Sequence, residues 1–332
     1  MFSYIRGAAT LARARRHMQP AFCAAAALLA LAGKAEAHGF AGDRFFPATL
    51  QTDDPFVADE ASLPTLTKNP TDSTGQQSYS IEADIAKRLF SDLGVTAAYS
   101  WNYFQPKGLP PSSGWGGLST GVQYQLFINN PHEFMGLVGL DVDWGHTGAV
   151  NQGGADDHTT LSPTFDFGKG MGDLPDSLTW LKPIAITGNI GMSFPTKVNS
   201  NGDLNQDTFN AGFALEYSLE YLQHHVKDIG LSAPFDRLIP LVEVTSTTPI
   251  NRGFNADSGL TNGTGSATTG VVAPGIIWAG QTFQLGAEAI LPYGQGQGHG
   301  VGAVLQLHFF LDDLFPHSIG RPIISDGPLF GR

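Results

Sequence analysis

Apolar and polar residues alternate along most of this chain. The clearest example is residues 209–222, where the odd positions hold Phe, Ala, Leu and Tyr and the even positions hold Asn, Gly, Ala, Ser and Glu. A period of two indicates a β-strand with one apolar face, because successive side chains of a strand point to opposite sides. The same alternation predicts strands at 79–90, 95–103, 118–128, 134–144, 184–194, 238–246, 282–291 and 301–311, with weaker copies at 160–167 and 271–278.

The predicted strands are long. An ordinary strand has about five or six residues, whereas a tilted strand that crosses a bilayer needs about 9–11. Aromatic residues gather near the strand ends, as in the girdles of outer-membrane barrels; examples are Tyr79, Trp101, Trp144, Phe194 and Trp278. The pattern therefore predicts an all-β protein, a transmembrane antiparallel up-and-down β-barrel. A soluble β-sandwich or β-solenoid is the alternative, since both also alternate.

The connections between the predicted strands differ in length. Short turns lie at 91–94, at 129–133 and at Gly280, with 224–237 as a longer exception, whereas 106–117, 145–159, 195–206, 249–270 and 292–298 are long. Outer-membrane barrels have short periplasmic turns and longer outer loops. If the short turns are periplasmic, an ascending strand must precede 79–90, and 56–67 is the candidate. We therefore predict twelve strands, or ten if 56–67 and 160–167 are not strands.

The first 37 residues predict a cleaved signal peptide. Basic residues (Arg6, Arg13, Arg15, Arg16) precede the apolar stretch 21–33, and Ala-Glu-Ala at 35–37 is typical of a cleavage site. Export by a bacterial cell follows from this pattern. The expected organisation is a signal peptide at 1–37, an N-terminal periplasmic segment at 38–55, the barrel at 56–311 and a C-terminal periplasmic tail at 312–332.

Composition narrows the class of protein further. Gly accounts for 41 of the 332 residues and charged residues for only 14 %, where a soluble domain has about 25 %. The formal net charge of −12 argues against a nucleic-acid partner, because phosphate contacts need clustered Lys and Arg. The single cysteine excludes a disulfide framework. A barrel with an apolar outer face and a small, polar inner face explains this composition.

Four short motifs carry a family resemblance. They are Thr52-Asp53-Asp54-Pro55, Lys87-Arg88 at the end of the first clear strand, Gly114-Trp115-Gly116 and Gln123-Tyr124-Gln125-Leu126-Phe127. Because these four motifs follow one another in this order, the chain resembles proteobacterial outer-membrane barrels known as transporters of the phenol-degradation meta-pathway type. The resemblance implies a channel or transport role for small, often hydrophobic molecules and brings no catalytic residues. The chain departs from the usual barrel ending, since 21 residues follow the last predicted strand.

The alternation also sorts the residues that would face the barrel interior. We predict as pore-lining candidates Glu82, Asp84, Arg88, Asp141, Asp143, Glu216, Glu220, Glu243, Glu288 and His308, with Gln123, Gln125, Gln284 and Gln306 beside them. Acidic walls in a low-dielectric tube attract cations. The sequence therefore predicts an outer-membrane channel or transporter-like barrel for small molecules, which prefers cations or passes hydrophobic and aromatic compounds. Alternatively the carboxylates pair with Lys and Arg or share protons in a filled lumen, as in a non-conducting structural or binding barrel.

Other candidate chemistry in the sequence is weaker. A copper site at His38 would need a second histidine nearby, His224-His225 falls in a turn exposed to solvent, and the oxygen-bearing residues at 199–207 lack the Gly and Glu of a calcium loop. An enzyme acting on lipids is a further alternative, but no Gly-x-Ser-x-Gly elbow occurs. We expect no enzymatic activity, no cofactor and no metal. The expected partners are outer-membrane lipid, a small solute and, during biogenesis, the barrel assembly machinery.

Overall fold

The structure is a computed structural model that describes residues 39–197, 199–200, 203–250, 268–294, 298–324 and 327–329. The chain divides into two units, residues 1–35 and 36–332, and every element below belongs to the second. The predicted signal peptide at 1–37 and its cleavage site lie outside the described residues. No helix among the described residues is both long and apolar enough to cross a membrane.

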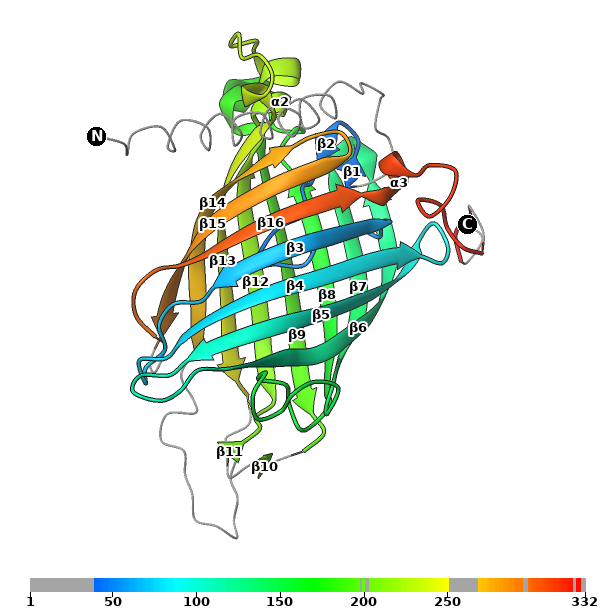
Figure 1. The fold of residues 1–332 in the computed structure, drawn as a ribbon. Coiled ribbons are helices and arrows are strands. Elements are labelled where there is room, and N and C mark those ends of the chain that lie inside the picture. Colours follow the sequence, from blue (N-terminus) through cyan, green and yellow to red (C-terminus); the bar gives the residue numbers. More distant parts are fainter. Residues whose placement is uncertain are drawn as a thin grey trace, which may run out of the picture. The chain divides into compact units, whose positions relative to one another are not determined.

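Twelve antiparallel strands close into one barrel (Figure 1). They are β3 (Glu60–Lys68), β4 (Gln77–Arg88), β5 (Leu93–Gln105), β6 (Ser112–Asn129), β7 (Phe134–Trp144), β8 (Thr160–Gly170), β9 (Ile184–Pro195), β12 (Thr208–Tyr217), β13 (Leu238–Pro249), β14 (Thr269–Ala279), β15 (Phe283–Gly294) and β16 (Gly302–Phe310). The first strand, β3, pairs with the last, β16, which closes the ring. The prediction of twelve strands is confirmed, and the weak alternations at 160–167 and 271–278 correspond to β8 and β14.

Three predicted boundaries were wrong. The first strand begins at Glu60 rather than at residue 56, and residues 112–117, predicted as loop, form the start of β6. β12 ends at Tyr217, and the chain turns there into α2 (Leu219–Tyr221), with the Ser218 hydroxyl accepting a hydrogen bond from the Tyr221 amide. A serine cap of this kind starts a helical turn. Glu220 therefore lies exposed in α2 and not on the barrel wall.

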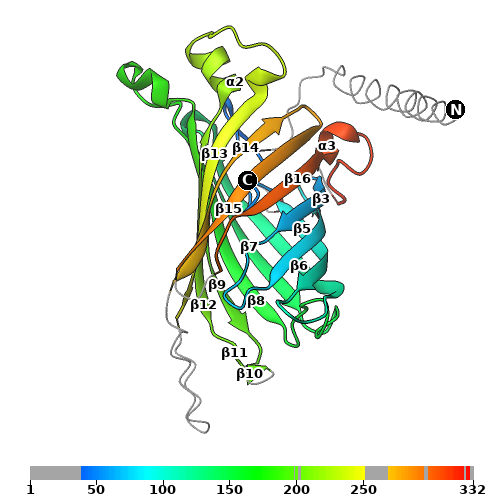
Figure 2. The same cartoon turned by 60° about the vertical axis from the view of Figure 1, so that its left-hand side comes forward.

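The barrel has two different ends, seen in Figures 1 and 2. One end, here called the turn end, carries α2 and the short helical elements η1 (Asn130–His132), η2 (Asp176–Leu181), η3 (Leu222–Val226), η4 (Phe235–Arg237) and α3 (Leu311–Leu314). The opposite end, the loop end, carries the small hairpin of β10 (Asn199–Ser200) and β11 (Asp203–Leu204). The rule that outer-membrane barrels keep their turns on the periplasmic side assigns the turn end to that side.

The two faces of each strand differ as the alternation predicts. In β12, Phe213 and Leu215 are exposed on the outside, while Ala214 and Glu216 between them are buried inside. Large apolar side chains on the outer face of other strands are also exposed, among them Ile81, Val138, Leu140, Val244, Ile276, Leu285 and Leu305. Aromatic side chains stack near the loop end, as Tyr99 does on Trp115 with ring centroids 5.1 Å apart. This distribution matches a lipid-facing wall with an aromatic girdle.

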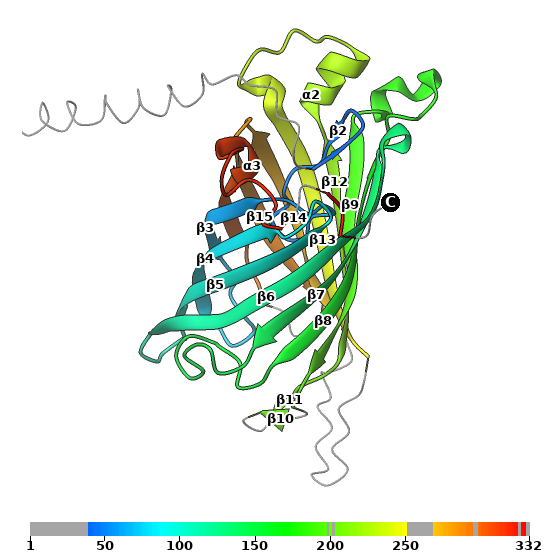
Figure 3. The same ribbon diagram turned by 90° about the vertical axis from the view of Figure 1, so that its right-hand side faces the viewer.

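Residues 39–59 lie inside the barrel and not outside it. A small hairpin of β1 (Phe40–Ala41) and β2 (Arg44–Phe45) lies at the turn end (Figure 3), and residues 46–59 continue among inward-facing side chains of the strands. We call residues 39–59 the N-terminal segment. The sequence predicted residues 38–55 as a periplasmic segment, and alternation alone gave no reason to place them in the lumen.

The chain after β16 folds back over the turn end. The amides of Ile323 and Ile324 donate hydrogen bonds to the carbonyls of Arg88 and Leu89, and the Leu329 amide donates to the Asp92 carboxylate. The tail therefore packs on the turn that joins β4 to β5, close to the start of the barrel.

Candidate functional site: the lumen and its N-terminal segment

Inward-facing polar side chains hold the N-terminal segment inside the barrel. Gln284 of β15 makes two hydrogen bonds to the backbone of Ala48, and Gln125 of β6 accepts from the Val57 amide at 3.1 Å and donates to the Pro55 carbonyl at 3.0 Å. Both glutamines are buried. Because they satisfy backbone groups that would otherwise lie unpaired at membrane depth, they fix the path of the segment.

Glu243 of β13 makes more hydrogen bonds to the segment than either glutamine does. Its carboxylate accepts hydrogen bonds from the amides of Leu50 (2.7 Å) and Gln51 (3.0 Å) and from the Thr52 hydroxyl (2.9 Å). The side chain is completely buried. Hydrogen bonds to an ionised acceptor are about twice as strong as neutral ones. Glu243, predicted as pore-lining, thus binds the N-terminal segment.

Arg44 anchors the segment at the turn end. Its guanidinium, 0 % exposed, lies 3.2 Å from the Glu133 carboxylate, donates to the carbonyls of Pro183 (3.1 Å) and Lys182, and packs 3.7 Å from the centre of the Tyr221 ring. Burial, and then the hydrogen bond to Glu133, raise the pKa of Tyr221 to about 12, so it donates to that carboxylate at 2.8 Å.

The backbone of Glu133 supports a specific role for this anchor. Glu133 has φ 45°, a left-handed conformation that favours glycine. A non-glycine residue held there costs about 1 kcal/mol or more and usually marks a functional constraint. The carboxylate of Glu133 contacts Arg44, the Tyr221 hydroxyl and the Gly172 amide, which glycine could not do.

Arg88, predicted as the fixed cation of the pore, belongs to an ion network where the segment joins β3. The buried carboxylate of Asp59 lies 2.5 Å from Lys87 Nζ and 2.9 Å from Arg88, and Arg88 is 3.4 Å from Asp312 beyond the last strand. The backbone carbonyl of Asp59 accepts from the Leu311 amide at 2.8 Å. Arg88 therefore links the residue just before β3 and a residue just after β16 to β4.

An open cavity of about 340 Å³ lies between the segment and the wall formed by β3 to β8. Four of the predicted pore-lining carboxylates line it: Glu82, Asp84, Asp141 and Asp143. The segment adds Asp53 and Asp54, β8 adds Asp166, and Glu60 stands at the start of β3. Among the described residues, eight carboxylates and one histidine, but neither lysine nor arginine, line this cavity, which we call the acidic cavity.

His308 sits within the acidic cavity in a row of polar groups. Its Nδ1 lies 3.0 Å from the Ser62 hydroxyl and its Nε2 lies 3.3 Å from the Glu60 carboxylate. A serine protease places its serine on Nε2 and its acid on Nδ1, the reverse of this order. His308, predicted as pore-lining, is 2 % exposed and belongs to this buried row.

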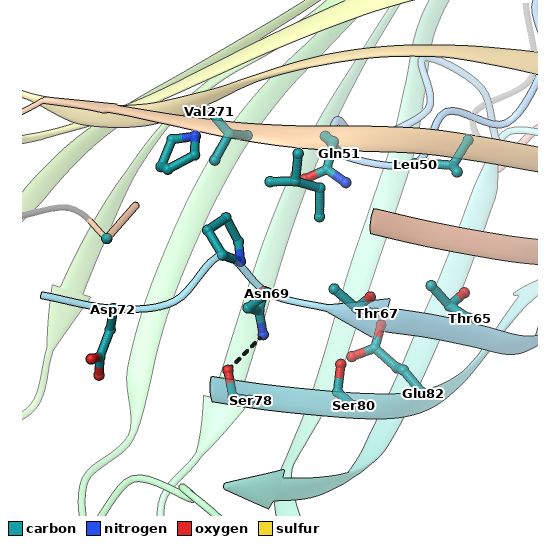
Figure 4. A pocket seen from close by; sticks show the side chains of 14 residues that line it. Leu50, Gln51, Thr65, Thr67, Asn69, Asp72, Ser78, Ser80, Glu82 and Val271 are labelled. Carbon is teal, nitrogen blue, oxygen red and sulfur yellow. Dashed lines mark hydrogen bonds between the residues drawn. The ribbon is translucent and has the colours of Figure 1, made fainter. Parts of the chain in front are cut away.

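A second cavity, of about 420 Å³, opens toward the loop end (Figure 4). In it Leu50 and Gln51 of the segment face Thr65, Thr67, Ser80 and Glu82 of β3 and β4. Asn69 donates a hydrogen bond to the Ser78 hydroxyl at 3.1 Å at its outer rim. Glu82 lines both cavities, so the two volumes adjoin along β4.

The surroundings of the carboxylates that belong to the N-terminal segment disfavour their charged form. The pKa of Asp54 is raised well above its ordinary value, first by burial and then by the nearby carboxylate of Glu60. Burial likewise raises the pKa of Asp53, although a hydrogen bond from Asn189 at 2.6 Å partly opposes this. Protonation of these groups therefore favours the arrangement in which the segment lies among other acids.

The predicted residues thus divide into separate groups. Glu216 accepts from the Thr187 hydroxyl at 2.9 Å, and Glu288 lies beside Glu243; both are buried in the wall formed by β12 to β15. Glu220 lies outside the barrel. Sequence reasoning missed Arg44, Glu60, Asp53, Asp54 and Asp166 as interior groups. Asp166 could have been found, because Ser162, Thr164 and Asp166 alternate with Leu161, Pro163 and Phe165.

Comparisons with known proteins rest on structure alone. No family model and no curated protein sequence matches this chain. Its fold is similar to that of the COG4313 outer membrane channel from Pseudomonas putida F1, with a TM-score of 0.54 and 11 % identity over 76 % of this chain and 95 % of that one. It is also similar to the NanC porin (TM-score 0.43, 10 % identity, 76 % and 98 % covered) and the KdgM porin (0.42, 9 %, 75 % and 98 %). The chain thus has the fold of an outer-membrane β-barrel.

Proposed function

We propose that this protein is an outer-membrane channel that passes small molecules and prefers cations. The observation that carries the proposal is the acidic cavity, where the described lining residues include eight carboxylates and no lysine or arginine around an open volume inside a closed barrel. Fixed negative charge in a low-dielectric tube concentrates cations and repels anions. The similarity of fold to an outer membrane channel supports the same conclusion.

The N-terminal segment narrows this channel. Arg44 fixes it at the turn end and Glu243 in the middle of the lumen, and it separates the acidic cavity from the wall formed by β12 to β15. We infer that solutes pass along the β3 to β8 side of the segment, and that displacement of the segment widens the path.

Reversal potentials in a planar bilayer under a KCl gradient test the proposal. The wild type should favour K⁺ over Cl⁻, and Asp84→Asn with Asp141→Asn and Asp143→Asn should lower that preference. Glu220→Gln is the matched control, since Glu220 has the same charge but lies exposed in α2. A wild type without conductance, or a triple variant as selective as the wild type, would contradict the proposal.

A second candidate function is the passage of small hydrophobic or aromatic compounds. The resemblance to transporters of the phenol-degradation meta-pathway type favours it, and so does an apolar groove of about 450 Å³ on the outer wall. The groove is lined by Pro64, Leu66, Ile276, Leu285 and Leu305, and Gln306 lines both the groove and the acidic cavity. Uptake of radiolabelled toluene by proteoliposomes would separate this function from a purely ionic pore.

We propose no catalytic role for the interior. The row of Ser62, His308 and Glu60 has the reverse order of a hydrolytic triad, and the porins and channels of similar fold are not enzymes. Outer-membrane lipid around the apolar outer face and the barrel assembly machinery during insertion are the partners that this function requires.

A further inference from the structure

The carboxylates of the acidic cavity lack cationic partners. Among the described residues none of the eight pairs with a lysine or an arginine, and His308 beside Glu60 is the single basic side chain of the lining. Asp143 is hydrogen-bonded to the Ser119 hydroxyl, and Asp54 accepts from the Thr49 amide. Carboxylates gathered in a low-dielectric interior repel one another strongly unless they bind protons or a cation lies between them.

One of these eight carboxylates, Asp166, indicates a ligand by its hydrogen bonding and not only by its negative charge. Asp166 is 1 % exposed, and its Oδ2 accepts from the Thr164 hydroxyl at 3.3 Å, but its Oδ1 has no hydrogen-bond partner among the residues that the structure describes. A buried carboxylate oxygen left without a donor costs about 1–3 kcal/mol, so such groups usually have a partner. Asp166 lines the acidic cavity, so a rotation of its carboxylate would bring this oxygen to a donor located there.

Two glycines leave room for polar side chains of this part of the wall. A Cβ at Gly121 would collide with Asp141 Oδ1, and a Cβ at Gly139 would lie 2.6 Å from Thr164 Oγ1 and 3.9 Å from Asp166 Oδ2. A larger residue would displace the Asp141 side chain at position 121 and the Thr164 side chain at position 139. The two glycines therefore leave room for the present positions of Asp141 and Thr164 beside Asp166.

The acids extend from one part of the wall to another, and Asp54 and Asp143 interact with carboxylates on both parts. Asp53, Asp141 and Asp166 interact with one another on the β7–β8 side, while Glu60 and Asp84 lie beside His308 at β3 and β4. Strand pairing puts Asp84, Ala98, Ser119 and Asp143 in one row across four strands. Three interstrand spacings of ~4.8 Å separate the ends of that row by roughly 14 Å along the wall.

This spacing favours an extended cation over a metal ion. No group of three acidic or histidine side chains among the described residues is close enough to hold a metal. Phe56 and Ala98 lie in the same lining and offer apolar surface for a methylene chain. A volume of about 340 Å³ is at the lower end of the roughly 300–1,000 Å³ of small-molecule sites.

We propose that the acidic cavity binds an aliphatic di- or polyamine, with one ammonium group donating to Asp166 Oδ1 and Asp141 and a second near Asp84 and Glu60. This deepens the proposed function, since it names a class of cation that the lumen selects. Each terminal primary ammonium supplies three donors, as a lysine does, enough for the free carboxylate oxygens of one group.

Isothermal titration of the full mature chain in detergent with spermidine tests the proposal. Saturable binding is expected, with butylamine, which has one ammonium, and Mg²⁺ binding at least about tenfold more weakly. Asp166→Asn should weaken spermidine binding about tenfold, the loss of one charged hydrogen bond. Asp173→Asn is the control, because Asp173 lies outside the barrel wall and pairs with Lys169.

Several outcomes would overturn the proposal. They are a wild type without saturable binding, butylamine or Mg²⁺ as strong as spermidine, or Asp166→Asn as tight as the wild type. If Asp166→Asn loses the heat-dependent gel shift of a folded barrel, Asp141→Asn decides by the same criterion. Titration in detergent needs no conductance, so a protein that binds spermidine but passes no current contradicts the proposed function alone, and the reverse result contradicts this inference alone.

Discussion

Inward-facing polar residues have different roles on two parts of the barrel wall: on one part they bind the N-terminal segment, and on the other they face a cavity. On the wall formed by β12 to β15, Glu243 and Gln284 are fully buried because the N-terminal segment lies on them. On the wall formed by β4 to β8, Asp84, Asp141 and Asp143 face the acidic cavity. Both sets arise from inward positions of period-two strands. The difference teaches that the path of one 21-residue segment, and not the strand pattern, decides which carboxylates are structural and which meet solute.

The largest effect is expected from removal of the anchor at the turn end. Arg44→Ala leaves the buried Glu133 carboxylate unpaired, and breaking a buried ion pair costs about 3–5 kcal/mol. The segment should leave the lumen in part of the molecules, and both walls should then face the channel. Single-channel conductance should rise severalfold, and protease should cleave the segment. Lys182→Ala is the control, since only its backbone carbonyl contacts Arg44. Unchanged conductance would mean that the segment does not limit the path.

A smaller release of the N-terminal segment is expected when its contact with Glu243 in the middle of the lumen is removed. Glu243→Ala leaves the amides of Leu50 and Gln51 without their acceptor, at about 1–3 kcal/mol each before lumen water compensates. Conductance should rise less than in Arg44→Ala, because the anchor at β2 still holds. Glu243→Gln retains one acceptor oxygen and should fall between Glu243→Ala and the wild type. If the two Glu243 variants do not differ, the hydrogen bonds are not what holds the segment.

Ion selectivity should separate the two walls directly. Asp143→Asn removes one charge from the open cavity. A charge about 10 Å from an ion in a water-like medium stabilises K⁺ and destabilises Cl⁻ by ~0.4 kcal/mol each, so its loss should lower the K⁺/Cl⁻ preference about fourfold. Glu216→Gln should change that preference less, because Glu216 is buried against Thr187. Reversal potentials measure both variants, and equal shifts would remove the distinction between the walls.

The smallest effect concerns pH. Because the pKa of Asp54 is raised by burial and by Glu60, the docked segment binds a proton more tightly than the released one. Docking is therefore strongest below the ordinary carboxyl pKa and weakens as pH rises toward the raised value. Conductance should increase modestly over that range, and Asp54→Asn should flatten the increase. A conductance that falls as pH rises would contradict the prediction that docking of the segment weakens over this range.

Much of the fold could be read from alternation. Positions such as Phe213 and Glu216 of β12 have fixed sides because a strand turns every second side chain the same way. The reading failed where local hydrogen bonds override the period, as at Ser218, which starts α2 and removes Glu220 from the barrel. It also failed at Glu60, because the four residues before it alternate no worse than the strand itself.

The functional assignments were harder to predict. Arg88 has the period of a lumen residue, yet Asp59 and Asp312, 29 residues before it and 224 after it, hold it in an ion network. Asp53 and Asp54 carry no strand pattern, so nothing local indicated that they enter the barrel. Long-range contacts of this kind depend on how the ring closes, which periodicity does not encode.

The sequence by itself determined the all-β class, the twelve strands and the acidic interior, since each follows from a repeat of two residues and from the identity of the polar positions. Only the tertiary structure decided that residues 39–59 occupy the lumen, because Arg44, Glu133, Gln125 and Glu243 meet from distant parts of the chain. It also decided which carboxylates remain open to a cation. A strand's pattern fixes which side a residue faces, whereas what it faces depends on what else the closed barrel contains.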